Sequence, residues 1–208
     1  MHNKDLDEMQ RRIFLGFLIL FFVVVTLLGC APTSVIIQKP SHLPSRQMID
    51  EVPQLHQGRN ECGPTSLAMV LNYYGVRKKK DELKADLRWD PEKGVSIRKM
   101  VRFPFEKYGF KFVIWKGSIE ELMEQISQNR PVIVRQWINY DEKAKGKMGH
   151  WRVVIGYDHE IGRIYMRDPA ITTGGFSDLS YKAFLDLWNL SYPATHSKNL
   201  MLVLIPEK

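Results

Sequence analysis

The amino-acid sequence predicts an α+β fold in which a helical lobe packs against an antiparallel β-sheet. Helical periodicity dominates the first half of the globular region, and short β-rich runs dominate the second half. Apolar residues make up 44% of the 208-residue chain, which is enough to build a core. Helices followed by strands, rather than a regular alternation of the two, are typical of this fold class.

The predicted helices follow from the spacing of their apolar residues and from the signals at their ends. In the first of them, residues 64–74, apolar side chains recur at helical spacing, and Pro64 suits the first turn. The further predicted helices span Lys80–Leu87, Ser96–Tyr108, Ser118–Asn129 and Tyr181–Asn189. Pro104 should bend or end the helix that contains it.

The predicted strands are short runs rich in β-branched and aromatic residues. They span Lys111–Trp115, Pro131–Trp137, Gly149–Asp158, Arg163–Asp168 and Asn199–Pro206. The third and fourth of these runs are separated by a short turn near Glu160–Gly162. They are therefore expected to form an antiparallel hairpin.

The N-terminal region indicates export and attachment to a membrane. Arg11 and Arg12 precede an uncharged apolar run of 17 residues, and Cys30 follows it directly. The letters LLGC at this point resemble a bacterial lipobox. By that resemblance, residues 1–29 are a lipoprotein signal peptide and Cys30 becomes the lipidated first residue of the mature chain. An uncleaved signal anchor is the alternative.

A tether and one globular domain are expected after the signal peptide. The stretch up to Met48 contains three prolines and no sustained helical pattern, so residues 30–48 are predicted to be a lipidated tether. Residues 49–208 are predicted to be the domain. The protein would then lie in the bacterial cell envelope, attached to a membrane by lipid. Its domain would be outside the cytoplasm, on the periplasmic side in a Gram-negative bacterium.

The charge of the chain suits a surface near anionic lipid or wall polymers. The formal net charge is +7, and residues 1–29 carry equal numbers of basic and acidic groups, so the excess belongs to residues 30–208. No basic motif with interleaved aromatic residues accompanies this charge. Nucleic acid is therefore not an expected partner.

Cys62 is the candidate nucleophile. The chain has two cysteines, which could form one disulfide in an exported protein. If Cys30 carries lipid, Cys62 remains a free thiol. It lies at the start of a predicted helix, where the unsatisfied amides and the helix dipole favour a thiolate. Gly63 beside it would let a substrate backbone approach closely.

His150 and Asp168 are the candidate base and its orienting group. A cysteine nucleophile needs an imidazole, and the imidazole needs a third group to hold it. His150 opens a predicted strand, and Asp168 ends the next one, so the hairpin should bring the two almost opposite each other. The remaining histidines lie in the signal peptide, the tether, the loop before Cys62, a turn and a polar loop: His2, His42, His56, His159 and His196.

The blocks VPQLHQGRNECGPTSLAMVLNYYG, GHWRVVIGYD and IYMRDP resemble the papain-like bacteriocin-processing cysteine peptidases. These are the double-glycine leader peptidase domains of peptide-exporting ABC transporters and their stand-alone relatives. The resemblance covers roughly residues 52–206 and implies a papain-like cysteine peptidase fold. The catalytic residues that it implies are Cys62 as nucleophile, His150 as base, Asp168 as its orienting group and Gln57 in the oxyanion hole. Gln54 is the alternative for the last role, although its spacing from Cys62 fits less well.

The sequence therefore predicts a membrane-anchored cysteine peptidase that acts on a peptide or protein. It contains no GxxxxGK[ST] ATP-binding motif, so cleavage of a leader coupled to secretion is not implied. A thiol amidase or transpeptidase acting on wall peptides is one alternative, and a non-catalytic binding lipoprotein that keeps the fold is another. No cofactor or metal is predicted, because His150 and Asp168 have no further His, Cys or Glu cluster at ligand spacing.

Overall fold

The computed structural model describes residues 14–16, 37–102, 108, 110–138, 148–172, 176–189 and 198–206. The chain divides into two compact units, residues 1–35 and 36–208. Of the first unit, only a helical turn at residues 14–16 is described, so most of the predicted signal peptide and the predicted lipidation site, Cys30, lie outside the described residues. No helix in the described ranges is long and apolar enough to cross a membrane.

The second unit is built on an antiparallel sheet of seven described strands. The strands are β1 (Arg46–Met48), β2 (Phe110–Lys116), β3 (Val132–Ile138), β4 (Met148–Asp158), β5 (Arg163–Arg167), β6 (Ser177–Ser180) and β7 (Leu200–Pro206). Neighbours follow the order β2-β7-β3-β4-β5-β6, and β1 pairs with the end of β4. The long strand β4 therefore lies at the centre of the pairing.

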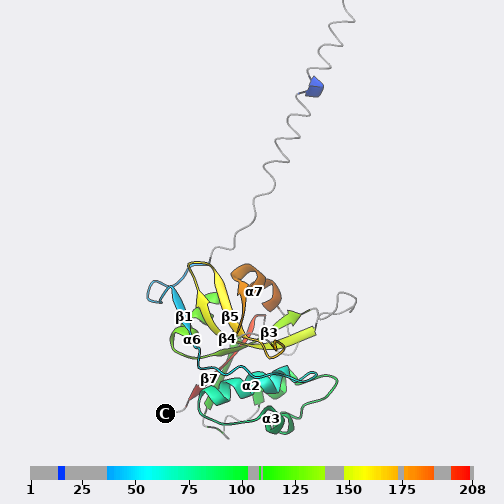
Figure 1. Cartoon of the computed structure of the whole chain (residues 1–208). Coiled ribbons are helices and arrows are strands. Elements are labelled where there is room, and N and C mark those ends of the chain that lie inside the picture. Colours follow the sequence, from blue (N-terminus) through cyan, green and yellow to red (C-terminus); the bar gives the residue numbers. More distant parts are fainter. Residues whose placement is uncertain are drawn as a thin grey trace, which may run out of the picture. The chain divides into compact units, whose positions relative to one another are not determined.

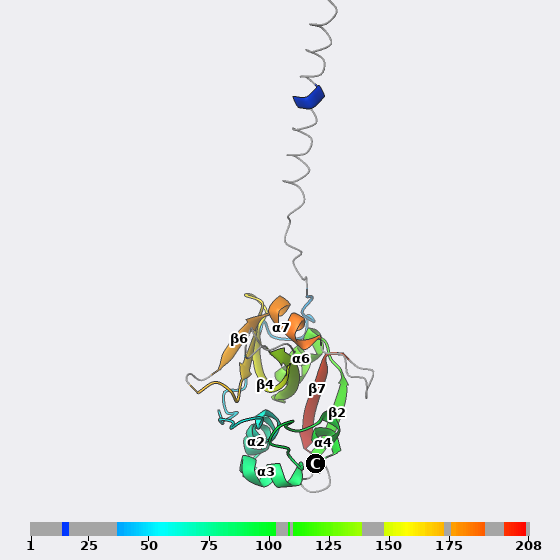
Figure 2. The same ribbon diagram turned by 90° about the vertical axis from the view of Figure 1, so that its right-hand side faces the viewer.

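The described helices lie on both sides of this sheet. They are α2 (Cys62–Tyr73), α3 (Lys80–Asp86), α4 (Ile97–Arg102), α6 (Ile119–Ser127) and α7 (Tyr181–Trp188). In Figures 1 and 2, α2 and α3 lie on one side of the sheet and α7 on the other. The predicted α+β fold is confirmed. Of the predicted helix at 96–108, α4 and the helical residue Tyr108 are described, and Pro104 lies outside the described residues.

The local sequence explains why α6 begins where it does. Ser118 accepts a hydrogen bond from the backbone amide of Glu121 at 3.2 Å, and the Glu121 carboxylate accepts one from the Ser118 amide at 2.9 Å. This reciprocal capping satisfies two amides that the helix leaves without partners. The apolar face then meets the core through Ile119, Leu122, Met123 and Ile126, as the spacing predicts.

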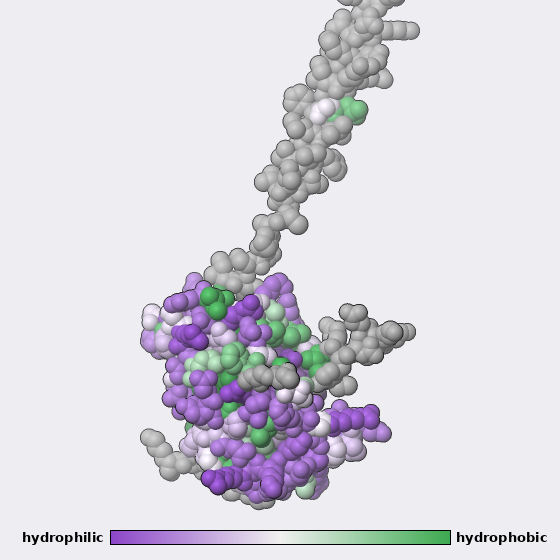
Figure 3. Space-filling model, in the orientation of Figure 1, coloured by the Kyte–Doolittle hydropathy of each residue, from purple (hydrophilic) through white to green (hydrophobic). Residues whose placement is uncertain are grey.

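The core lies between the sheet and the helices. Its largest fully buried side chains include Trp151 on β4, Trp188 and Phe184 on α7, and Leu67 on α2. The face of the domain seen in Figure 3 is mostly hydrophilic, with apolar residues scattered over it. This division between inside and outside is the expected source of the domain's stability.

The folded domain begins before the predicted boundary at residue 49. Residues 46–48, expected to be part of the tether, form β1 and pair with Gly156–Asp158 of β4. Leu43 is buried as well. The approach is so close that a Cβ on Gly156 would collide with the side chain of Met48. The backbone pairing and this packing make the segment part of the sheet.

Candidate active site

Cys62 is the first residue of α2 and lines a pocket of about 340 Å³. It is partly buried, and the amides of the first turn of α2 lie next to it. Gly63 has a packing role: an added Cβ would lie 3.3 Å from Val95 and 3.4 Å from Trp151. These contacts give the glycine a packing reason, the close fit of the helix start against Trp151 on β4, and the prediction that Gly63 also serves substrate approach stays a prediction.

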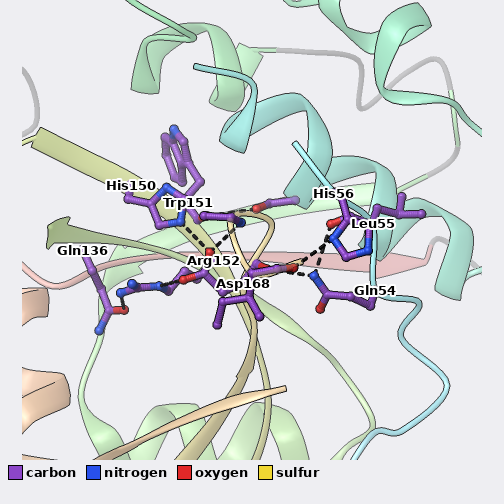
Figure 4. A network of polar contacts seen from close by, with 11 residues as sticks. Gln54, Leu55, His56, Gln136, His150, Trp151, Arg152 and Asp168 are labelled. Carbon is purple, nitrogen blue, oxygen red and sulfur yellow. Dashed lines mark hydrogen bonds and ion pairs between the residues drawn. The ribbon is translucent and has the colours of Figure 1, made fainter. Parts of the chain in front are cut away.

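His150 lies on β4, is 2% exposed and lines the same pocket as Cys62. Its Nε2 is 2.7 Å from Oδ1 of Asp168, the residue that follows β5. The structure thus brings Cys62, His150 and Asp168 together as predicted. Figure 4 shows His150 and Arg152 both directed toward Asp168.

A β-bulge places Asp168 on the His150 face of the sheet. Near the turn, Asp158 pairs with Arg163, and this register would put Asp168 opposite Val153, on the other face. The register shifts between Val154 and Gly156, so that Val153 pairs with Arg167 instead. Asp168 is then opposite Arg152, which shares a face with His150. Asp168 thus lies two residues along from the position directly opposite His150, in agreement with the prediction that the two are almost opposite each other.

The Asp168 carboxylate is buried and held from three sides. Besides His150, it accepts hydrogen bonds from Nε of Arg152 at 2.6 Å and from the amide of Ala170 at 2.9 Å. Burial alone would raise the pKa of Asp168. The hydrogen bond from His150, the Arg152 charge and the Ala170 amide more than reverse this, and the pKa of Asp168 lies well below its ordinary value. The carboxylate is ionised at neutral pH.

The electrostatics of the pocket favour a thiolate–imidazolium pair. Burial raises the pKa of the Cys62 thiol, but the hydrogen bond and charge of His150, a backbone hydrogen bond with Trp151 and the charge of Arg135 bring it below its ordinary value. Burial lowers the pKa of His150, whereas its hydrogen bonds with Asp168 and Cys62 raise it, and the net shift is upward. A low thiol pKa next to a high imidazole pKa is typical of an activated cysteine.

The structure gives different positions to the two glutamines that were considered for the oxyanion hole. Gln57 lines the pocket with Cys62, and its buried side-chain oxygen has no hydrogen-bond partner among the residues that the structure describes. Gln54 instead donates its side-chain amide to the backbone oxygen of Asp168 at 2.8 Å, as Figure 4 shows. The side-chain amide of Gln54 is therefore used to hold the chain after β5, and Gln57 is the glutamine in the pocket.

Residues 47–196 match the Peptidase_C39 like family. The chain belongs to this family. It is a cysteine peptidase, and the expected resemblance to the double-glycine leader peptidases is confirmed at the level of family and fold. No curated protein matches the sequence.

Solved structures share the peptidase fold at low sequence identity. A C39-like peptidase from Bacillus anthracis is 19% identical with a TM-score of 0.59, covering 78% of this chain and 98% of its own. The peptidase domain of Streptococcus ComA, a bi-functional ABC transporter of a quorum sensing pathway, is 22% identical with a TM-score of 0.56, covering 74% and 97%. A double glycine motif protease from an AMS/PCAT transporter, in complex with the leader peptide, is 21% identical with a TM-score of 0.54, covering 82% and 99%.

An ion-pair cluster that the sequence analysis missed supports the loop before the peptidase's Cys62. The Glu61 carboxylate accepts hydrogen bonds from the Gly58 amide at 2.8 Å and from Lys84 at 2.7 Å, and it lies 2.7 Å from Nζ of Lys80. Burial raises the pKa of Glu61, but these lysines and the amide lower it to about 2. The run Arg77–Lys80 was the sequence signal for available cations, but only the fold brings Lys80 and the nearby Lys84 beside Glu61.

A second missed group lies behind the His150 side of the peptidase site. Arg152 bridges Asp168 and Gln136, because its Nη1 donates to the Gln136 side-chain oxygen at 2.8 Å. The sequence signal for this group was a charged residue within the apolar run of β4. Which partners Arg152 contacts, however, depends on the register of the neighbouring strands. Within the described ranges, no group of three His, Cys, Asp or Glu side chains could hold a metal ion.

Proposed function

We propose that this peptidase hydrolyses peptide bonds through a triad of Cys62, His150 and Asp168, with Gln57 in the oxyanion hole. One observation carries the proposal. Cys62 at the start of α2 and the buried His150 line one pocket, and Asp168 holds the far side of the imidazole at 2.7 Å. A nucleophile, a base and an orienting group in this order are the elements of covalent acyl transfer.

The reaction would proceed in two stages. The Cys62 thiolate attacks the carbonyl carbon of the scissile amide, and the resulting oxyanion is bound by the Gln57 side-chain amide and the Cys62 backbone amide. The imidazolium of His150 then protonates the leaving nitrogen, and the C–N bond breaks to give a thioester. Water attacks the thioester while His150 takes its proton. Cleavage of the C–S bond releases a carboxylic acid and regenerates the thiolate.

A peptide is the expected substrate. One of the related structures holds a leader peptide, which supports peptide binding by this fold. The pocket beside Cys62 contains both charged side chains and the aromatic Trp151. It therefore offers polar and apolar surfaces to an extended chain.

The lipid anchor on Cys30 and the location in the cell envelope are part of the same proposal. They are supported by the apolar run and the LLGC letters before the tether. Metabolic labelling with a radioactive or clickable fatty acid tests them. We expect label on the wild-type chain and none on Cys30→Ala. If the wild-type chain is found in the membrane fraction without label, an uncleaved signal anchor is supported instead.

The triad is tested by alkylating Cys62 with iodoacetamide between pH 5 and pH 10, in the full chain purified in a mild detergent. Mass spectrometry distinguishes Cys62 from Cys30. We expect wild-type Cys62 to react well below the ordinary thiol pKa of about 8.5, and His150→Ala to lose that reactivity. His42→Ala removes an exposed histidine and should change nothing. Equal, ordinary reactivity in all three proteins would contradict the triad.

Hydrolysis of a peptide library separates the proposed reaction from its alternatives. A peptidase releases new carboxylates in water alone, whereas a transpeptidase requires an added amine. We expect cleavage by the wild type and none by Cys62→Ala. If an activated Cys62 forms acyl products only when an amine is present, the enzyme is a transferase.

A further inference from the structure

A chain of polar groups, buried except for the partly buried Arg152, continues from His150 to helix α7. Asp168 contacts His150 at 2.7 Å and accepts from Arg152 Nε at 2.6 Å; Arg152 Nη1 donates to Gln136 at 2.8 Å, and Gln136 donates to the backbone oxygen of Phe184 at 3.2 Å. Figure 4 shows Arg152 between Asp168 and Gln136. Gln136 is fully buried and Asp168 is only 4% exposed. The chain of contacts therefore connects the site to the core rather than to solvent.

The sheet places this chain of contacts behind the imidazole. Gln136 on β3 pairs directly with His150 on β4. Arg152 lies two residues along β4, so its side chain is on the same face, and the bulge brings Asp168 to this face as well. Arg152 thus has a fixed position, with one nitrogen on the carboxylate and another on the amide. A guanidinium suits this task because its donors lie in a rigid plane.

Arg152 is the cation in direct contact with the Asp168 carboxylate, so it offsets that charge locally. In the reactive ion pair, Cys62 on α2 is negative and His150 is positive, while Asp168 after β5 is negative and Arg152 is positive. Gln136 on β3 is neutral, and Arg135 on the same strand lines the pocket on the Cys62 side. Without Arg152, the Asp168 charge would act on His150 without a neighbouring cation to offset it. A buried charge without such compensation is costly.

We propose that Arg152 is a positioning residue for catalysis: it fixes the Asp168 carboxylate toward His150 and offsets the charge of that carboxylate. Asp168 then orients the imidazole much as a neutral amide would, and does not over-stabilise its protonated form. This inference rests on the proposed function, in which Asp168 orients His150. Gln136 completes the arrangement by holding the second nitrogen of Arg152.

Titration of His150 by NMR tests the charge offset. The full chain is labelled with ¹⁵N-histidine in a mild detergent, and the His150 signal is assigned by its absence from His150→Gln. In Arg152→Met, a neighbouring positive charge is lost, so we expect the pKa of His150 to rise by about one unit. Arg152→Lys keeps the charge and should stay close to the wild type. If Arg152 only fills space, the pKa of His150 should stay unchanged. A fall would mean that Asp168 moves away, which supports the positioning role but overturns the charge offset.

A double variant tests the pairing of the two charges independently. In Asp168→Asn, Arg152 loses its counter-charge, and we expect the urea midpoint of unfolding to fall. Adding Arg152→Met removes the uncompensated cation, so the double variant should have a higher midpoint than Asp168→Asn alone. Purely additive losses would overturn the inference.

The failures of the two proposals are distinguishable. If wild-type Cys62 alkylates as an ordinary thiol and His150→Ala changes nothing, the proposed function fails, and the catalytic role of Arg152 fails with it. If Cys62 is activated by His150 but Arg152→Met leaves the pKa of His150 unchanged, the inference about Arg152 fails alone.

Discussion

Cys62 and His150 line the same pocket, but the contacts that hold them differ in burial and in their dependence on strand register. The loop before Cys62 is supported by Glu61, whose partners Lys80 and Lys84 lie on the next helix and remain partly exposed. His150 is held by Asp168, which in turn is held by Arg152, within the sheet and its core. The cysteine side therefore depends on ion pairs near solvent, and the histidine side on a buried network.

This difference predicts unequal tolerance to change. Ion pairs that water can reach contribute roughly 0–1 kcal/mol each, whereas loss of one member of a buried, charged network costs about 3–5 kcal/mol. Single substitutions on the histidine side should therefore cause large losses of stability and activity. Substitutions on the cysteine side should cause smaller losses, and these losses should depend more strongly on salt concentration.

Substitution of Asp168 by alanine should have the largest effect. It frees the His150 ring and leaves Arg152 as an uncompensated, partly buried cation. We expect kcat/KM on a cleaved library peptide to fall by about 10³- to 10⁴-fold, and the free energy of unfolding to fall by about 3–5 kcal/mol. Steady-state kinetics and urea unfolding measure the two quantities.

A matched control for this variant is Asp178→Ala. Asp178 pairs with Arg163 at 3.1 Å, but both side chains are more than 40% exposed. We expect its removal to change the free energy of unfolding by less than about 0.5 kcal/mol and to leave kinetics unchanged. Similar losses in both variants would contradict the contrast between buried and exposed pairs.

Substitution of Glu61 by glutamine should have an intermediate effect. The amide keeps an acceptor for Gly58 but removes the charge that Lys80 and Lys84 compensate. We expect about 1–2 kcal/mol of destabilisation at pH 7, and a loss of activity on the order of tenfold, because the loop carrying Gln57 loosens. Urea unfolding and kinetics at low and high salt measure these effects.

The same variant predicts a pH dependence. The pKa of Glu61 falls to about 2 in the folded protein, from an ordinary 4.5. A lowered acid pKa contributes stability that is complete above the unfolded value and is lost as pH falls through the folded one. The stability difference between wild type and Glu61→Gln should therefore shrink between pH 4.5 and pH 2. Glu82→Gln, at an exposed pair with Lys78, should show much less of this effect.

The extent to which the site could be predicted from the sequence follows the same division. Cys62 at a helix start could be predicted because helical periodicity and Pro64 are local signals. His150 and Asp168 could be predicted from strand order. Their exact register could not be predicted with the same ease, because the bulge at Val154–Gly156 decides which face Asp168 occupies. Gly156 inside the strand run is the one signal of that shift, but a glycine there indicates a close backbone approach equally well.

Elements that depend on distant partners were also missed. Arg152 lies in an apolar strand, and its partly buried position can be explained only once β3 and the end of β5 are placed beside it. The strand β1 has only three residues after a proline-containing stretch, so it has no period of its own. Its pairing with β4 is decided by packing against Gly156 and by the burial of Leu43.

The smallest expected effect concerns Arg135, the one described arginine that lines the pocket. Its guanidinium lies 5.5 Å from the centre of the Trp151 ring and directly over Gly149. Its charge is one of the influences that lower the pKa of Cys62. In Arg135→Gln, loss of this cation should raise the pKa of Cys62 by a few tenths of a unit.

Alkylation of Cys62 as a function of pH separates this charge effect from a change in the shape of the pocket. A higher thiol pKa reduces the thiolate fraction only below the titration midpoint, so the rate should fall by roughly twofold there and stay unchanged on the alkaline plateau. Arg163→Gln removes a surface charge and should leave the whole profile in place. An equal loss at every pH would mean that Arg135 acts on access to the thiol. The low pKa of Cys62 would then rest on His150, which the buried network holds in place.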